Sequence, residues 1–198
     1  MVLASKKAIT QKMKNKTLVA CQIFEDELNA CLKDRKGLRI VWVDAALHAD
    51  LDLLEKELRN VLADTDPQRE SVRLLFGSGC HPEMAGIAKE LGTQTAPCKN
   101  CIEWLAGEEA KELEQNRTML MTPAWVRVWP KIMYLMGWSE VDVRMQLGRY
   151  DRIMVLDPGL NPLTDEETLE FFDLVQVPVE PHPVDLEYFC RRLDTLLN

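Results

Sequence analysis

The chain has 198 residues, of which 46% are hydrophobic and 28% charged, an ordinary composition for a globular protein. Its net charge of −8 argues against a nucleic-acid-binding surface, which needs clustered lysine and arginine. The lysines of residues 1–16 have no aromatic residues between them, so we expect a basic, solvated N-terminal extension there. We recognise no signal peptide and no apolar run of roughly 18 residues, so the sequence predicts a cytoplasmic protein without membrane contact.

Short apolar runs alternate with longer segments of helical period, which is typical of a parallel sheet covered by helices. The predicted strands are 17–21, 38–43, 72–76, 93–96, 118–121, 151–156 and 175–179. The predicted helices include 23–32, 49–62, 123–136, 139–147, 165–174 and 184–197, and a further helix begins at Pro82. We therefore predict one Rossmann-like, doubly wound α/β domain over residues 17–198, with a mostly parallel sheet of six or seven strands. Residues 123–147 are expected to form a helical flap.

Four cysteines follow the ends of predicted strands. Cys21 ends the first strand, and Cys80 follows the glycine turn behind the third. Cys98 and Cys101 form a C-x-x-C motif behind the short run 93–96. The carboxyl ends of parallel strands share one edge of a sheet, where open α/β folds build their sites. Because thiolates are ligands of zinc and of iron–sulfur clusters, the sequence predicts a metal site on these four cysteines.

Other residues extend this prediction. His48 follows the second strand, so we expect it at the same edge, as a metal ligand or an acid–base group. Trp125 lies four residues before Trp129 on one helical face, where the two form either the wall of a ligand pocket or a packed aromatic pair. Cys31 and Cys190 occupy apolar helical positions and are expected to pack in the core, because cytoplasmic cysteines stay reduced.

Two alternatives need no metal. In the first, Cys80 is a thiolate nucleophile on a strand-to-helix turn, stabilised by the helix N-terminus and by His81. In the second, the chain is a small-molecule-binding or regulatory module whose thiols are incidental. Dinucleotide-binding, P-loop and H-E-x-x-H motifs are absent, so the sequence gives no support to those classes. Three nearby carboxylates are expected to be solvated: Glu25, Glu27 and Glu83.

The order of these motifs resembles an uncharacterised family, domain of unknown function 1638. The resemblance rests on the following segments: Ala20-Cys21, Leu47-His48, Leu75 to Cys80, Cys98-x-x-Cys101-Ile102 and Leu120 to Trp125. The chain departs from the family pattern at Lys99-Asn100, where His-Asp is expected, and at Ala124, where glycine is usual. The resemblance implies a role in or beside the corrinoid-linked one-carbon (methyl) metabolism of anaerobes, with a small molecule or a corrinoid protein as partner. It implies no particular reaction.

The leading hypothesis is thus a cytoplasmic, cysteine-rich α/β protein that binds zinc or an iron–sulfur cluster. Its ligands would be Cys80, Cys98 and Cys101, with Cys21 or His48 completing the set. Zinc with three protein ligands and an open position would activate a thiol or a water.

Overall fold

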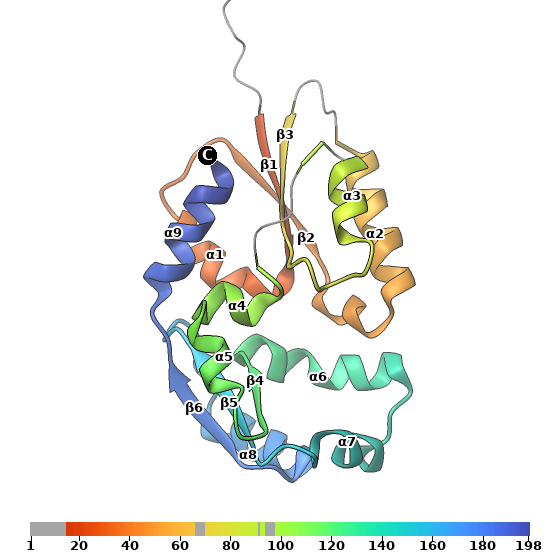
Figure 1. The fold of residues 1–198 in the computed structure, drawn as a ribbon, viewed down its shortest axis with the longest axis vertical. Coiled ribbons are helices and arrows are strands. Elements are labelled where there is room, and N and C mark those ends of the chain that lie inside the picture. Colours follow the sequence, from red (N-terminus) through yellow and green to blue (C-terminus); the bar gives the residue numbers. More distant parts are fainter. Residues whose placement is uncertain (1–14, 66–69, 91, 94–97) are drawn as a thin grey trace, which may run out of the picture.

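The computed structural model describes residues 15–65, 70–90, 92–93 and 98–198. Within these ranges the strands form two separate sheets of three parallel strands each (Figure 1). The first sheet has the order β2-β1-β3 and the second the order β4-β5-β6. The strand bounds are β1 Asn15–Cys21, β2 Leu38–Val43, β3 Glu70–Leu75, β4 Thr118–Met121, β5 Arg152–Asp157 and β6 Val179–Pro183. The predicted α/β class is confirmed, and the predicted single sheet of six or seven strands is wrong. Most of the predicted strand 93–96 lies outside the described residues.

Helices cover both faces of the first sheet. Figure 1 shows α1 (Glu25–Leu32) and α9 (Leu186–Leu197) on one side, and α2 (Leu51–Ala63) and α3 (Met84–Glu90) on the other. The central strand β1 is therefore buried on both faces, and its run Leu18-Val19-Ala20 is fully inaccessible to solvent. This burial explains why residues 18–21 of β1 are all apolar instead of alternating between apolar and polar residues.

The second sheet also lies between helices. Ile153 and Val155 of β5 join a core with α6 (Pro123–Met136), α7 (Glu140–Leu147) and α8 (Asp165–Val175). Met154 and Leu156 point to the opposite face, into a smaller core with α4 (Cys101–Ala106) and α5 (Glu109–Leu113). The alternation along β5 is that of a strand buried on both sides.

Helix α6 begins and ends as its sequence predicts. The Thr122 hydroxyl accepts a hydrogen bond from the backbone N–H of Trp125 at 3.2 Å, and Pro123 occupies the first helical position. Gly137 ends the helix with a φ of 64°, a left-handed conformation that glycine adopts without steric cost. Pro130 lies inside the helix.

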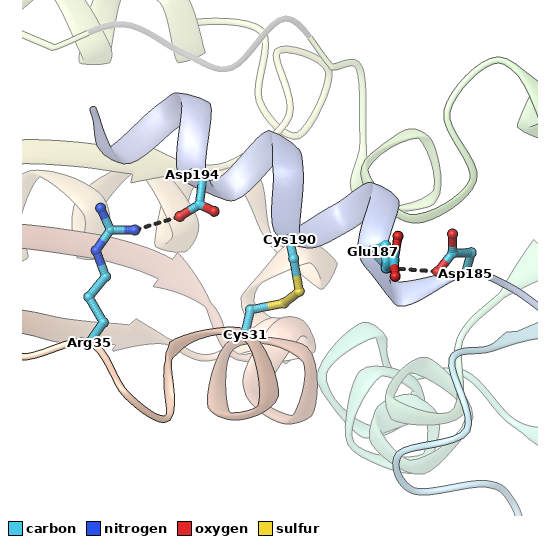
Figure 2. The surroundings of a disulfide bond; sticks show 6 residues. All are labelled: Cys31, Arg35, Asp185, Glu187, Cys190 and Asp194. Atoms are coloured by element: carbon cyan, nitrogen blue, oxygen red, sulfur yellow. Dashed lines mark hydrogen bonds and ion pairs between the residues drawn. A yellow bond between two sulfur atoms is a disulfide. The ribbon is translucent and has the colours of Figure 1, made fainter.

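The last helix returns to the first sheet. After β6, α9 packs against α1 and α4, and Phe189 lies 5.2 Å from Phe24 and 5.8 Å from Trp104 between ring centroids. A disulfide joins Cys190 of α9 to Cys31 of α1 (Figure 2). The expectation that these two cysteines are reduced residues of the core is wrong, because the two helices hold their Cα atoms 5.5 Å apart, within disulfide reach.

Polar contacts fix the same helix. Arg35 and Asp194 form an ion pair at 2.7 Å, also visible in Figure 2. Lys16 of β1 donates to the backbone carbonyl of Leu197 at 2.7 Å.

Disulfides persist mainly in oxidising compartments, so the Cys31–Cys190 bond runs against the expectation of a fully reduced set of thiols. None of the helices in the described ranges is long and apolar enough to span a membrane.

The carboxyl ends of both sheets face a shared middle layer. Asp26, which follows β1 in the sequence, accepts a hydrogen bond at 3.1 Å from the side-chain amide of Asn161, which follows β5. Asp44, behind β2, forms an ion pair with Lys131 of α6. Figure 1 shows α6 running between the two sheets, and α6 packs against the turn Ala45–Ala49 that follows β2. Sites built at the strand ends of either sheet therefore open into the same layer.

Candidate functional site

A cavity of about 290 Å³ lies in this middle layer and is lined by three thiols. The thiols belong to Cys21, Cys80 and Cys101, and His48 and Trp125 line the same cavity. Apolar side chains make up much of the remaining wall: Ile23, Phe24, Leu51, Leu75 and Phe76. The structure thus brings together five of the six residues singled out from the sequence. Cys21 ends β1, and His48 and Cys80 follow the neighbouring strands β2 and β3, whereas Trp125 belongs to α6.

A backbone contact brings Cys80 and Cys101 to the same cavity. The turn behind β3 lies against residues 98–100, and the N–H groups of Ser78 and Gly79 donate to the carbonyls of Cys98 and Lys99, each at 2.8 Å. Gly77 permits this approach, because a Cβ atom there would lie 2.3 Å from the Lys99 carbonyl oxygen. The glycine turn therefore has a steric role in assembling the site.

Cys98 does not line this cavity. Its side chain is 2% exposed and packs in the core around the first sheet, where burial raises its pKa to about 11. The two cysteines of the C-x-x-C motif are separated by the start of α4. The Asn100 side chain caps that helix, so Cys101 is its first residue and Cys98 precedes it. The predicted ligand set that includes Cys98 therefore differs from the arrangement in the structure.

His48 is a neutral imidazole in an aromatic setting. It stacks on Phe76 with an interplanar angle of 12° and meets Trp125 edge-on at 5.5 Å between centroids. Burial lowers the pKa of His48. Its Nδ1 lies 2.9 Å from the Ala45 carbonyl oxygen, which only accepts, so Nδ1 carries the proton and Nε2 the lone pair. This is the tautomer that metal-binding histidines use when they coordinate through Nε2.

The three thiols of the cavity are protonated at neutral pH. Burial raises the pKa of each, to about 12 for Cys101. The proximity of Cys80 and Cys101 raises the pKa of Cys21 further. In the part of the chain that the structure describes, no group of three or more His, Cys, Asp or Glu side chains is arranged to hold a metal ion.

Hydrogen bonds lower the pKa of each of the three thiols and so oppose the effect of burial. The Trp125 indole N–H donates to the Cys101 sulfur at 3.0 Å. Backbone groups of Ile23 and Gly77 hydrogen-bond to the sulfurs of Cys21 and Cys80, respectively. Such bonds stabilise a thiolate once it forms, and hydrogen bonds to sulfur also tune iron–sulfur clusters.

His81 does not support the nucleophile alternative. Its side chain is buried, with Nε2 3.6 Å from a Glu55 carboxylate oxygen and Nδ1 accepting from the Glu83 N–H at 3.0 Å. The hydrogen bond that lowers the pKa of the Cys80 thiol comes from the Gly77 backbone, and burial outweighs it. Reactive cysteines have lowered pKa values, so Cys80 lacks the expected electrostatic activation.

The sequence interpretation missed Glu27. This carboxyl group, expected to be solvated, is 4% exposed, and its Oε2 has no hydrogen-bond partner in the structure. Burial raises the pKa of Glu27 to about 7, and the nearby charges of Asp26 and Asp157 add to the effect. The signal was present in the helical period, because residue 27 lies on the same face as the apolar positions 24, 28 and 31.

The fold and the cavity define a two-sheet, parallel α/β protein with three free thiols and a neutral imidazole between its halves. The family model described as "Protein of unknown function (DUF1638)" matches residues 42–193, and the chain belongs to this family. A comparison with curated proteins finds no match. Among solved structures, a zinc-bound AdcAII H205L variant from Streptococcus pneumoniae is 10% identical with a TM-score of 0.29, covering 94% of this chain and 100% of its own. That likeness is too weak to carry an argument.

Proposed function

We propose that this chain is a cysteine-rich metal-binding protein whose cavity holds a zinc ion or an iron–sulfur cluster. Cys21, Cys80 and Cys101 would provide three thiolates, and the Nε2 atom of His48 a fourth ligand. The observation that carries the proposal is the convergence of three thiols and a neutral imidazole on one cavity, where the Trp125 indole N–H also donates to the Cys101 sulfur. Thiolate and imidazole are the preferred donors for zinc, and thiolate for iron–sulfur clusters.

The electrostatics favour a metal over a free nucleophile. Without a cation, burial keeps the three thiols protonated. A bound cation reverses this situation, because a coordinating thiol loses its proton outright. The raised pKa values therefore fit a site that becomes anionic when metal binds, and they do not fit a reactive thiolate in a metal-free enzyme.

Binding requires a local adjustment. The described His, Cys, Asp and Glu side chains contain no group already arranged around one ion. The sulfurs must approach one another, and they are carried by the end of β1, the turn that follows β3 and the start of α4. With all four ligands bound, a zinc site would be closed. If His48 instead stays unbound, zinc held by the three thiolates would keep an open position and would act as a Lewis acid that deprotonates a bound water or thiol.

The cavity has room for more than the metal. Its volume of about 290 Å³ and its apolar wall suit a small molecule beside the ligands. A role in or beside corrinoid-linked one-carbon metabolism of an anaerobe stays part of the proposal and is supported by the family resemblance alone.

The test is metal analysis of protein purified without oxygen, combined with its absorption spectrum. We expect about one equivalent of zinc, or iron and sulfide with visible absorption, and loss of the metal in each of Cys21→Ser, Cys80→Ser and Cys101→Ser. Cys98→Ser is the matched control, a buried cysteine outside the cavity that should leave the metal in place. Metal-free wild-type protein, or equal loss in the control, contradicts the proposal. Rapid alkylation of Cys80 in metal-free protein would instead support the nucleophile alternative.

A further inference from the structure

A second cavity of about 380 Å³ adjoins the thiol cavity, and its two walls carry opposite charges. One wall, formed by the start of α1 and by the residue that follows β2, carries Glu25, Asp26 and Asp44. The other wall is a face of α6 with Arg127 and Lys131. We propose that this charged cavity binds the ammonium and carboxylate groups of an α-amino acid. The amino acid has sulfur in its side chain, and this second part rests on the proposed function.

The sequence of α6 explains the cationic wall. Positions 124, 127, 128 and 131 are spaced three or four residues apart, so they share one helical face, and this face lines the charged cavity. The apolar residues Val126, Trp129 and Ile132 lie on the opposite face, in the core of the second half. The helix is therefore fixed by its apolar side and presents its cations to the strand ends of the first sheet.

The two cations of the charged cavity, Arg127 and Lys131, differ in how firmly ion pairs fix them. Arg127 is fixed by a bidentate ion pair with Glu167 at 2.6 and 3.0 Å. Lys131 contacts Asp44 in an ion pair whose side chains are 55% and 37% exposed. Exposed ion pairs contribute little to stability, so a ligand carboxylate can compete for the Lys131 ammonium. The displaced Asp44, together with Glu25 and Asp26, would then face the ligand ammonium.

The two cavities are adjacent. Ile23 lines both of them, and Ala45 of the charged cavity accepts the hydrogen bond of His48 in the thiol cavity. Ala124 lines the charged cavity and its neighbour Trp125 the thiol cavity. A short side chain that passes Ile23 thus brings its end near the thiols. Because thiolate-bound metal centres accept soft donors, sulfur is the atom that suits that end.

The test is calorimetric titration of metal-loaded protein with L-methionine and three analogues. 3-(Methylthio)propylamine lacks the carboxylate, 4-(methylthio)butanoate lacks the ammonium, and L-norleucine lacks the sulfur. We expect L-methionine to bind, and each analogue to bind at least tenfold more weakly. Lys131→Gln should weaken L-methionine and 4-(methylthio)butanoate about tenfold. It should not weaken 3-(methylthio)propylamine, because the change frees Asp44 for the ligand ammonium.

Lys111→Gln is the matched control, because Lys111 is also an exposed lysine paired with a carboxylate, on α5 and outside the cavity. It should bind L-methionine like the wild type. Equal affinity for L-methionine and the amine, or no effect of Lys131→Gln, overturns the inference. Equal affinity for L-norleucine and L-methionine overturns the inference that the ligand side chain contains sulfur. Lys131→Gln should keep its metal. Metal-loaded wild-type protein that binds no amino acid refutes this inference alone. Wild-type protein that contains no metal refutes the proposed function.

Discussion

Removing the Cys31–Cys190 disulfide with the double substitution Cys31→Ser and Cys190→Ser should lower stability substantially. The bond joins residues 159 positions apart. The chain-entropy relation gives about 5 kcal/mol for a loop of this length, and measured effects are typically 2–4 kcal/mol. For a protein of this size, 1 kcal/mol corresponds to about 2–4 °C in melting temperature, so we expect a fall of roughly 5–15 °C.

The assay is thermal unfolding without reductant, followed by circular dichroism. Reductant should lower the melting temperature of the wild type towards that of the double variant and leave the variant unchanged. In unreduced, denatured wild-type protein, four of the six cysteines should react with a thiol reagent. Six reactive thiols, or a double variant that melts within about 1 °C of the wild type, would refute the reasoning.

Three further predictions concern single residues. Burial raises the pKa of Glu27 from 4.5 to about 7, so its stabilising contribution is complete below pH 4.5 and disappears as the pH rises through 7. Urea unfolding should therefore show that the free energy of unfolding of the wild type falls by up to about 3 kcal/mol between pH 5 and pH 8, whereas that of Glu27→Gln does not. Parallel pH profiles of the two proteins would contradict this prediction. Gly77→Ala should cost about 1–3 kcal/mol, because its Cβ would overlap a backbone carbonyl, whereas Gly86→Ala, with nothing closer than 3.4 Å, should melt near the wild type. Trp125→Phe removes the donor to Cys101, so the pKa of that thiol should rise and its alkylation at pH 9 should slow several-fold, with an unchanged rate as the contrary result.

The strands could be predicted from the sequence, but their partners could not. The predicted runs 38–43 and 118–121 coincide with β2 and β4, because apolar, β-branched residues between turn signals are a local pattern. Which strands pair depends on packing between distant segments, and nothing local reveals that β3 and β4 belong to different sheets. The predicted strand 175–179 is wrong over most of its length, since α8 continues to Val175 and β6 runs from Val179 to Pro183, so the two share only Val179.

The candidate site was foreseeable from the strand ends and less so from the motif. Cys21 ends β1, and His48 and Cys80 follow β2 and β3, so parallel pairing alone brings the three residues to one edge. The C-x-x-C motif suggested a paired use of Cys98 and Cys101. In the structure Cys101 lines the cavity, whereas Cys98 is buried in the core outside it. Which way each side chain points depends on the local backbone at the start of α4, and the spacing of the motif does not reveal this.

The return of α9 to the first half has a consequence for biosynthesis. When the ribosome has added residue 185, the strands of both described sheets have been made, yet the helix that closes the first half has not. Phe24 and Trp104 then still lack Phe189, their aromatic neighbour from α9. We expect the nascent chain to expose this apolar surface until the final helix emerges, so the half synthesised first is the last to be completed.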